Sequence, residues 1–207
     1  AFLRLEDGLR KAWKAPIEVY GYNFCGIISK ENWLLRAIEL KLGSFYFTWQ
    51  GMIDFSYLKS IKLKFIDYII HQDHYFGMIL FCKLKHIFTL SLKLYNYRIR
   101  NNSTIHYNED IVIPEYLMPI YLIFKDKFLL KQYHSKASLC LTLFSLLEFI
   151  NEYKDTLFVK AFLPTSILMC QDILNIKHDP WNVKDKFLVI FQTYIAITDF
   201  FPHSFHS

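Results

Sequence analysis

The stretch Ser135 to Tyr153, SKASLCLTLFSLLEFINEY, indicates the fold class of the chain. Wound as an α-helix, it gathers its apolar side chains on one continuous face, formed by Leu139, Leu143, Leu146, Leu147 and Ile150. Such a face requires another element to pack against, and the segments around it also show helical spacing. The sequence therefore predicts a mainly α protein with a helical bundle in its C-terminal half.

Four helices are predicted in that half. They are Glu115 to Gln132 with Pro119 in its first turn, Ser135 to Tyr153, Asp155 to Asn175 with a break at Pro164, and Asn182 to Phe200. The connections between them are short, and short connections make neighbouring helices antiparallel.

The N-terminal half shows mixed periodicity. Its predicted elements are an amphipathic helix from Phe2 to Trp13, a helix from its N-cap Ser29 to Leu42 with Gly43 behind it, a β-hairpin within Ser44 to Leu58, a helix from Leu58 to Ile69 and a strand from Leu84 to Leu94. We expect this half to be helical with β-hairpins, and an α+β fold is the alternative.

Charge and polarity divide the chain near residue 100. Residues 1–100 carry 15 Lys and Arg against 8 Asp and Glu, whereas residues 101–207 carry 9 against 11. The polar stretch Arg98 to Asp110, RIRNNSTIHYNED, lies at this change of sign and is typical of a loop. We expect a basic, aromatic-rich subdomain at 1–100, a polar connection at 101–113 and a helical subdomain at 114–207.

Composition excludes several classes of protein. Aromatic residues make up 18% of the chain, while Gly and Pro number only 6 each, which argues against disordered and collagen-like chains. The four cysteines, Cys25, Cys82, Cys140 and Cys170, form no CxxC pair that could clamp a metal. Buried free thiols are expected, and these suit an intracellular, reducing compartment.

Three apolar runs fall short of what a membrane-spanning helix requires. Gly77 to Leu94 and Tyr116 to Leu130 are interrupted by charged residues, and Ala137 to Ile150 is short and contains Glu148. A charge near the centre of a span costs about 2.5–3.5 kcal/mol on insertion scales. From these runs we expect no membrane span.

Residues suited to catalysis or ligand binding are sparse. The chain has no GxSxG elbow and no glycine pattern that cradles phosphate, so no catalytic residue, nucleotide or other cofactor is predicted. His71 and His74 are the only candidate metal ligands, since they would share one face of a helix. No further ligand is evident beside them, and no bound metal is expected.

Basic residues near the end of the first subdomain are the candidate interaction residues: Lys83, Lys85, Lys93, Arg98 and Arg100. They could meet an acidic surface of a partner protein. Tyr95 and Tyr97 lie among them, yet the sequence favours a hairpin with one packed face over a nucleic-acid site.

The stretch Phe128 to Pro164, FLLKQYHSKASLCLTLFSLLEFINEYKDTLFVKAFLP, resembles helical segments of interaction proteins of the ciliary axoneme. There a leucine-rich helix, a short charged turn and a second hydrophobic helix follow one another. The resemblance implies a place in a cilium and carries over no functional residues. An organelle interior is an equally open location.

Aromatic side chains are enriched at protein interfaces, and the sequence shows no constellation for chemistry. The function predicted from the sequence is therefore a non-enzymatic structural subunit of a larger assembly, which binds other subunits through aromatic-rich surfaces. A soluble enzyme and a membrane-peripheral protein are the alternatives.

Overall fold

A computed structural model describes residues 2–4, 16–92, 94, 96–98 and 112–200 of the chain. The chain folds into two compact units: unit 1 comprises Ala1–Phe65 and Asp73–Ile111, and unit 2 comprises Ile66–Gln72 and Val112–Ser207. The fold is mainly α, as predicted, and strands occupy a small part of the described residues.

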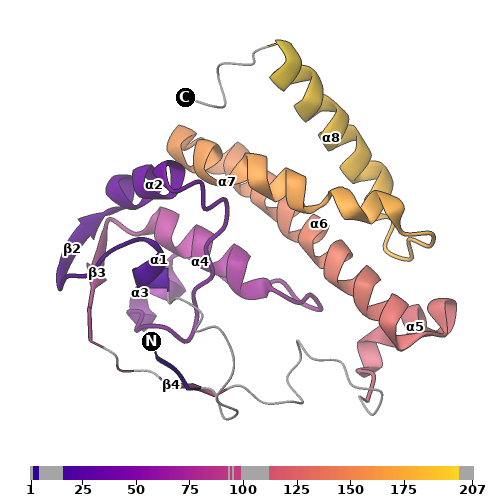
Figure 1. The fold of residues 1–207 in the computed structure, drawn as a ribbon, viewed down its shortest axis with the longest axis horizontal. Helices are drawn as coiled ribbons and strands as arrows, with labels where there is room; N and C mark the ends of the chain where they lie inside the picture. The colour runs from indigo at the N-terminus through magenta and orange to yellow at the C-terminus, as the bar shows by residue number, and fades with distance from the viewer. Residues whose placement is uncertain (1, 5–15, 93, 95, 99–111, 201–207) are drawn as a thin grey trace. The chain divides into compact units, whose positions relative to one another are not determined.

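Short elements make up unit 1 (Figure 1). They are β1 (Phe2–Arg4), α1 (Pro16–Val19), β2 (Gly26–Ser29), α2 (Lys30–Glu39), α3 (Phe55–Ser60), α4 (Gln72–Lys83), β3 (His86–Thr89) and β4 (Asn96–Arg98). β1 pairs in parallel with β4, and β2 pairs antiparallel with β3.

Unit 2 contains longer helices. Its elements are the 3-10 turn η1 (Glu115–Leu117), α5 (Met118–Phe124), α6 (Lys127–Tyr153), α7 (Thr156–Met169), the 3-10 turn η2 (Gln171–Asn175) and α8 (Val183–Phe200). α7 packs along α6, and α8 also contacts α6 (Figure 1). The segment Ile66–Gln72 belongs to this unit, although it precedes α4 in the chain.

The predicted cap of α2 is confirmed. Ser29 has extended backbone angles, and its side chain accepts a hydrogen bond from the backbone N–H of Asn32 at 3.1 Å. The helix stops at Glu39, before the predicted Leu42, because Lys41 already adopts a left-handed conformation with φ of 52°.

Three other predictions for the N-terminal half are wrong. Phe2–Arg4 form strand β1 instead of the start of a helix, and the remainder of that predicted helix, residues 5–13, lies outside the described residues. The predicted helix Leu58 to Ile69 ends early, since Lys62 and Tyr68 have positive φ angles that no right-handed helix contains.

The hairpin predicted within Ser44 to Leu58 does not form either. Phe45 to Phe47 form no strand; they run against α4, and the Phe47 N–H donates to the Asp73 carbonyl at 3.2 Å. Gly77 makes this close approach possible, because a Cβ on it would lie 2.7 Å from the Phe47 backbone nitrogen.

The strand predicted at Leu84 to Leu94 is shorter than expected. β3 covers only His86–Thr89, and its partner β2 lies about sixty residues earlier in the chain. Ile28 and Ile87 are opposite one another and buried, while the neighbouring pair Ile27 and Phe88 is exposed. The period of two was therefore a correct sign of a strand, but it carried no information about the partner.

In unit 2 two identical junctions separate the first three helices. Lys125 and Lys154 adopt left-handed conformations that end α5 and α6, and the following residues, Asp126 and Asp155, cap α6 and α7 through their carboxylates. The helix break predicted between Gln132 and Ser135 is consequently wrong, since α6 is continuous and the break lies at Lys125.

The break predicted at Pro164 is also wrong. Pro164 lies inside α7, which continues to Met169, and the turn η2 follows. Proline lacks the N–H that would bond the carbonyl of Lys160, yet the helix continues through it. The final helix, α8, agrees with its predicted range.

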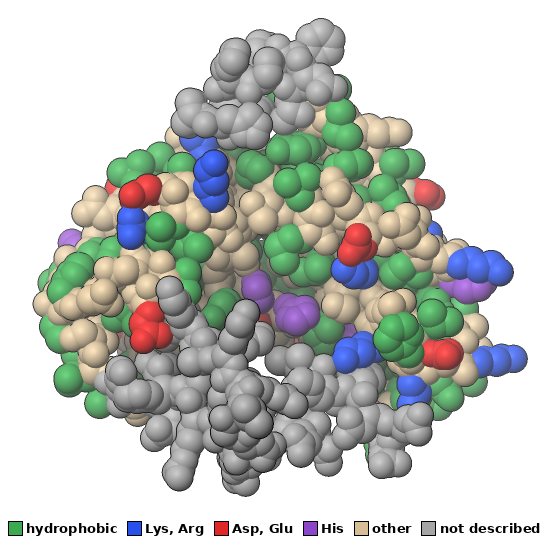
Figure 2. Space-filling model, viewed as in Figure 1, with side chains coloured by type: hydrophobic (Ala, Val, Ile, Leu, Met, Phe, Trp, Pro, Cys, Tyr) green, Lys and Arg blue, Asp and Glu red, His purple; other side chains and the backbone are tan. Residues whose placement is uncertain are grey.

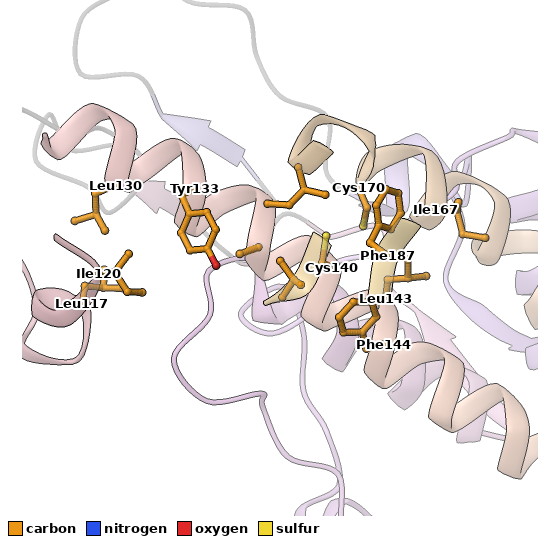
Figure 3. Packing of buried hydrophobic residues seen from close by; sticks show 13 residues of the cluster. Leu117, Ile120, Leu130, Tyr133, Cys140, Leu143, Phe144, Ile167, Cys170 and Phe187 are labelled. Carbon is orange, nitrogen blue, oxygen red and sulfur yellow. The ribbon is translucent and has the colours of Figure 1, made fainter. Parts of the chain in front are cut away.

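The core of unit 2 lies between α5, α6, α7 and α8. Thirteen buried residues form it, including Leu143 and Phe144 from α6, Ile167 from α7 and Phe187 from α8 (Figure 3). The predicted apolar face of α6 is confirmed for Leu143 and Leu146, which are fully buried.

A polar network crosses this core. The Tyr133 hydroxyl donates to the Asp179 carboxylate at 2.8 Å and accepts the backbone N–H of Trp181 at 2.7 Å. The second carboxylate oxygen of Asp179 accepts the Lys184 N–H at the start of α8. One side chain of α6 thereby fixes the loop that leads into α8.

Candidate interaction surfaces

The structure describes only part of the predicted basic patch. Lys83 is the last residue of α4, and its carbonyl accepts the Tyr57 hydroxyl at 2.6 Å, while Lys85 is exposed just before β3. Lys93 and Arg100 lie outside the described residues, and Arg98 is described only as part of strand β4. Whether the five side chains form one patch stays a prediction.

The expectation that His71 and His74 share a helix face is wrong. α4 begins at Gln72, and His71 precedes it with a φ of 61°. The Nδ1 atom of His74 hydrogen-bonds the Ser44 hydroxyl, and its ring lies 5.6 Å from that of Tyr46. Within the described ranges, no group of three or more His, Cys, Asp or Glu could hold a metal ion.

All four cysteines are free, and three of them are buried. Cys25 is the exception, because it lies exposed in the loop before β2, where the Ser91 side chain 3.3 Å away lowers the pKa of its thiol. A hydrogen bond with Cys140, together with burial, raises the pKa of the Cys170 thiol. Both thiols of this pair lie in the core of unit 2 (Figure 3).

The aromatic surplus is divided between interior and surface. In unit 1 many rings are buried against one another, among them Tyr20, Trp33, Phe45 and Phe81. Others are exposed, including Phe88 of β3 and Phe128 of α6. The aromatic content that suggested interfaces is thus partly core material.

Several exposed apolar side chains lie close together in the sequence on α5 and the first turn of α6. We name this group the α5 surface, and its members are Met118, Leu122, Ile123, Phe128 and Leu129. Leu122 and Phe128 are each 64% exposed. On the face shown in Figure 2, hydrophobic side chains likewise form broad areas between single charged residues.

The sequence of α5 explains this surface. Its seven residues, MPIYLIF, include no charged side chain. Ile120 is buried, and Tyr121 and Phe124 pack against the core of unit 2, so one side of the helix is accounted for. Leu122 and Ile123 project from the other side, and a helix that is apolar all round normally lies between two apolar partners.

Lysines border the α5 surface. Lys125 is exposed between α5 and α6, and Lys127 is half-buried in the first turn of α6. Asp126, which lies between them, is occupied with capping α6 through the Leu129 N–H. The sequence predicted one helix from Glu115 to Gln132 and did not indicate this surface.

One stretch of the described chain, Thr156–Asn175, is long and apolar enough to cross a membrane by length and composition. It is not one of the three apolar runs from which no membrane span was expected. Core helices pass the same test, and in this stretch 33% of the apolar window is buried, including Phe158, Ala161 and Phe162.

No protein family, curated protein or solved structure matches this chain. The resemblance of Phe128 to Pro164 to ciliary interaction proteins accordingly stays a prediction, as do the location and the partner that it implies.

Proposed function

We propose that the chain is a non-enzymatic subunit of a larger protein assembly and that the α5 surface binds another subunit. The observation that carries the proposal is the composition of α5, which presents apolar side chains on its outer side as well as on its core side. Covering that outer side with a partner removes apolar area from water, which stabilises a complex by about 25 cal/mol per Å².

The borders of the surface indicate the chemistry of the partner. Interfaces combine an apolar centre with a polar rim, and here the rim contains Lys125 and Lys127. A partner surface with an apolar centre and Asp or Glu around it fits both features. The exposed aromatic ring of Phe128 is of a type that is enriched where proteins meet.

A membrane surface is the competing occupant, because an apolar helix followed by lysines also suits the interface of a bilayer. We prefer a protein partner to a membrane because α5 is only seven residues long and the helix after it, α6, contributes Leu130 and Tyr133 to the core. Vesicle binding therefore serves as an outcome of the test.

Site-specific photo-crosslinking in the native cell tests the proposal. A benzoylphenylalanine placed at Leu122 is expected to cross-link to one protein in defined yield. The matched control places it at Val189, which is equally exposed and apolar but lies on α8. Cross-linking at both positions to the same mixture of proteins, or no protein adduct from Leu122, contradicts the proposal.

Measurements on the purified chain complete the test. The variant L122S/I123S/F128S should bind less of an apolar-surface dye and associate less with itself than the wild type, whereas V189S should not differ from it. A wild-type chain that is monodisperse and binds little dye contradicts an exposed docking surface. If the wild-type chain floats with phosphatidylcholine/phosphatidylserine vesicles and the triple variant does not, α5 binds a membrane instead of a protein.

A further inference from the structure

Unit 2 contains a pocket of about 450 Å³ that the proposed function does not use. The segment Ile66–Gln72 meets η1, α6 and the loop before α8 there. The lining residues are Asp67, Tyr68, Ile69, Tyr116, Leu141 and Trp181. Small-molecule sites in proteins typically have volumes of about 300–1,000 Å³, so the pocket has room for an organic group and part of the chain that carries it.

Three of these six lining residues are aromatic. The rings of Tyr68 and Tyr116 lie with their centroids 5.3 Å apart and are inclined to one another by 47°. Both side chains reach solvent, since Tyr68 is 67% exposed and Tyr116 is 40% exposed, and Trp181 is half-buried. A ligand that enters the pocket can therefore touch these side chains directly.

One buried residue of α6 contacts all three aromatic residues. The Nε2 atom of His134 hydrogen-bonds the Tyr68 carbonyl at 3.0 Å. The His134 ring lies edge-on to its neighbours, 6.0 Å from the ring of Tyr116 and 5.5 Å from that of Trp181. The Trp181 N–H also donates to the Tyr133 hydroxyl. Because these contacts already position the aromatic residues, a ligand need not order them first.

The backbone of Tyr68 is unusual for a bulky residue. Its φ of 62° lies in the left-handed region, which such residues rarely adopt. α6 secures the chain on either side of this conformation, because His134 bonds the Tyr68 carbonyl and the Ser138 hydroxyl accepts the Ile70 N–H at 3.2 Å. Strained residues held in this way cluster at binding sites, and here the strained residue carries a largely exposed ring.

The charge of the lining favours a cation. Asp67, directly before Tyr68, is exposed and supplies a carboxylate. The faces of aromatic rings are the negative side of the ring quadrupole, so they attract positive charge as well. Three aromatic residues and a carboxylate in one pocket therefore share the same preference.

The chemistry of the lining also indicates which cation fits. An unmethylated ammonium group is strongly hydrated and donates three hydrogen bonds, which aromatic rings and the aliphatic side chains of Ile69 and Leu141 replace poorly. A trimethylammonium group has no N–H and presents methyl groups to the rings. Aromatic cages recognise quaternary ammonium ligands for this reason.

We propose that this pocket binds a trimethylammonium group, such as that of choline or of a trimethylated lysine side chain. The rings of Tyr68, Tyr116 and Trp181 contact the methyl groups, and the Asp67 carboxylate balances their charge. None of these residues belongs to the α5 surface, so the proposal stands independently of the proposed function.

Titration calorimetry on the full chain at constant ionic strength tests the chemistry with three probes. Choline carries the trimethylammonium group, 3,3-dimethylbutan-1-ol has the same shape without the charge, and ethanolamine has the charge without the methyl groups. We expect saturable binding of one choline per chain, with both other probes weaker by about tenfold or more. Absence of saturable choline binding, or equal affinity for choline and either other probe, overturns the proposal.

A fourth probe, Nα-acetyl-Nε-trimethyllysine methylamide, distinguishes the two sources of the group. Tighter binding of this probe than of choline supports the proposal and assigns the group to a modified protein side chain. Tighter binding of choline supports it equally and assigns the group to a small choline compound.

Substitutions of the rings locate the bound choline. Tyr68→Leu and Trp181→Leu should each weaken it by about fivefold or more, whereas Tyr68→Phe, which keeps a ring, should stay within about twofold of the wild type. Tyr68 is largely exposed, so its variants should fold. Tyr153→Leu, at an exposed position of α6 outside the pocket, is the matched control. Unchanged choline affinity in both leucine variants of the pocket overturns the proposal.

Asp67→Asn tests the part of the carboxylate. It should weaken choline by about 3–10-fold and leave the affinity for 3,3-dimethylbutan-1-ol unchanged, because only choline is charged. Asp185→Asn, at an exposed position in the first turn of α8, is its control and should bind choline as the wild type does. Equal weakening of choline by both asparagine variants overturns the role of Asp67 in the pocket.

Discussion

Unit 1 and unit 2 bury their apolar side chains in different ways. In unit 1 short elements and a loop bring aromatic rings together, and a cavity of about 750 Å³ lies beside them. In unit 2 three long helices interlock aliphatic and aromatic side chains, and hydrogen bonds from Tyr133 fix the loop before α8. Unit 2 also has a pocket, of about 450 Å³, which is lined by Asp67, Tyr68, Ile69, Tyr116, Leu141 and Trp181.

The largest difference between the units should appear when a phenylalanine is truncated in each. Phe187→Ala removes a fully buried ring from the core of unit 2 and should lower its stability by about 3–5 kcal/mol. Phe81→Ala should cost less, because Phe81 already borders empty space on one side. Hydrogen exchange monitored by mass spectrometry reports the stability of each unit separately.

That pair of variants also tests whether the cavity exists in solution. Equal losses of protection in the two units would mean that Phe81 is packed as tightly as Phe187, and the contrast between the units would be lost.

A smaller effect is expected where unit 1 is packed most closely. Gly77→Ala places a Cβ 2.7 Å from the Phe47 backbone nitrogen and 2.9 Å from the Phe45 carbonyl oxygen. Backbone atoms cannot move aside as a side chain can, so we expect a loss of about 3 kcal/mol in unit 1, although alanine favours helices. Gly51→Ala is the control, since its Cβ would meet only the Phe47 ring.

A further comparison concerns the polar network that fixes a loop of unit 2 to the core of that unit. Tyr133→Phe leaves the Trp181 N–H without its acceptor and should destabilise the segment from Asp179 to Lys184 by about 2 kcal/mol. Faster exchange of the Lys184 amide would report the loosened loop. Tyr121→Phe, a partly buried tyrosine of α5, is the control, and a similar change in it would remove the network as the cause.

The same contrast explains how far the sequence could predict this structure. Helices with a long apolar repeat, such as α8 and the part of α6 from Ser135 to Tyr153, were predicted because residues only a few positions apart set such a repeat. The junction at Lys125 was missed, since a left-handed lysine has no clear signature, but the identical Lys-Asp pair at Lys154 and Asp155 was a usable signal.

Unit 1 was predicted less well because its elements depend on distant partners. β2 pairs with β3 some sixty residues away, and the Phe45–Phe47 stretch lies against Gly77 of α4. The sequence of the loop alone fits a hairpin equally well. The α5 surface was missed for a related reason, since a wholly apolar helix does not reveal which of its sides faces the core.

The smallest change in stability at neutral pH is expected from the protonation of His134. Its side chain hydrogen-bonds the segment Ile66–Gln72 to α6. His134 is fully buried, and its Nε2 hydrogen-bonds the Tyr68 carbonyl at 3.0 Å. The Ile70 N–H donates to the neighbouring Ser138 hydroxyl at 3.2 Å. Burial lowers the pKa of His134, and the nearby His71 lowers it further, against an opposing effect of the Tyr68 carbonyl.

The direction of this shift sets the pH dependence of unit 2. Below about pH 6.5 the unfolded chain protonates His134 while the folded chain still holds it neutral, so the unfolded state binds more protons. Stability should therefore be unaffected at neutral pH and should fall as the pH drops below about 6.5, until the lowered pKa of the folded state is passed. Hydrogen exchange of the Ile70 amide between pH 7.5 and 5, corrected for intrinsic rates, measures this loss of stability.

Two variants test the assignment to His134. His134→Gln should flatten the dependence of stability on pH, whereas His86→Gln, at an exposed position in unit 1, should leave it unchanged. An acid loss that persists in His134→Gln would assign the pH dependence to another group and leave the attachment of Ile66–Gln72 independent of protonation.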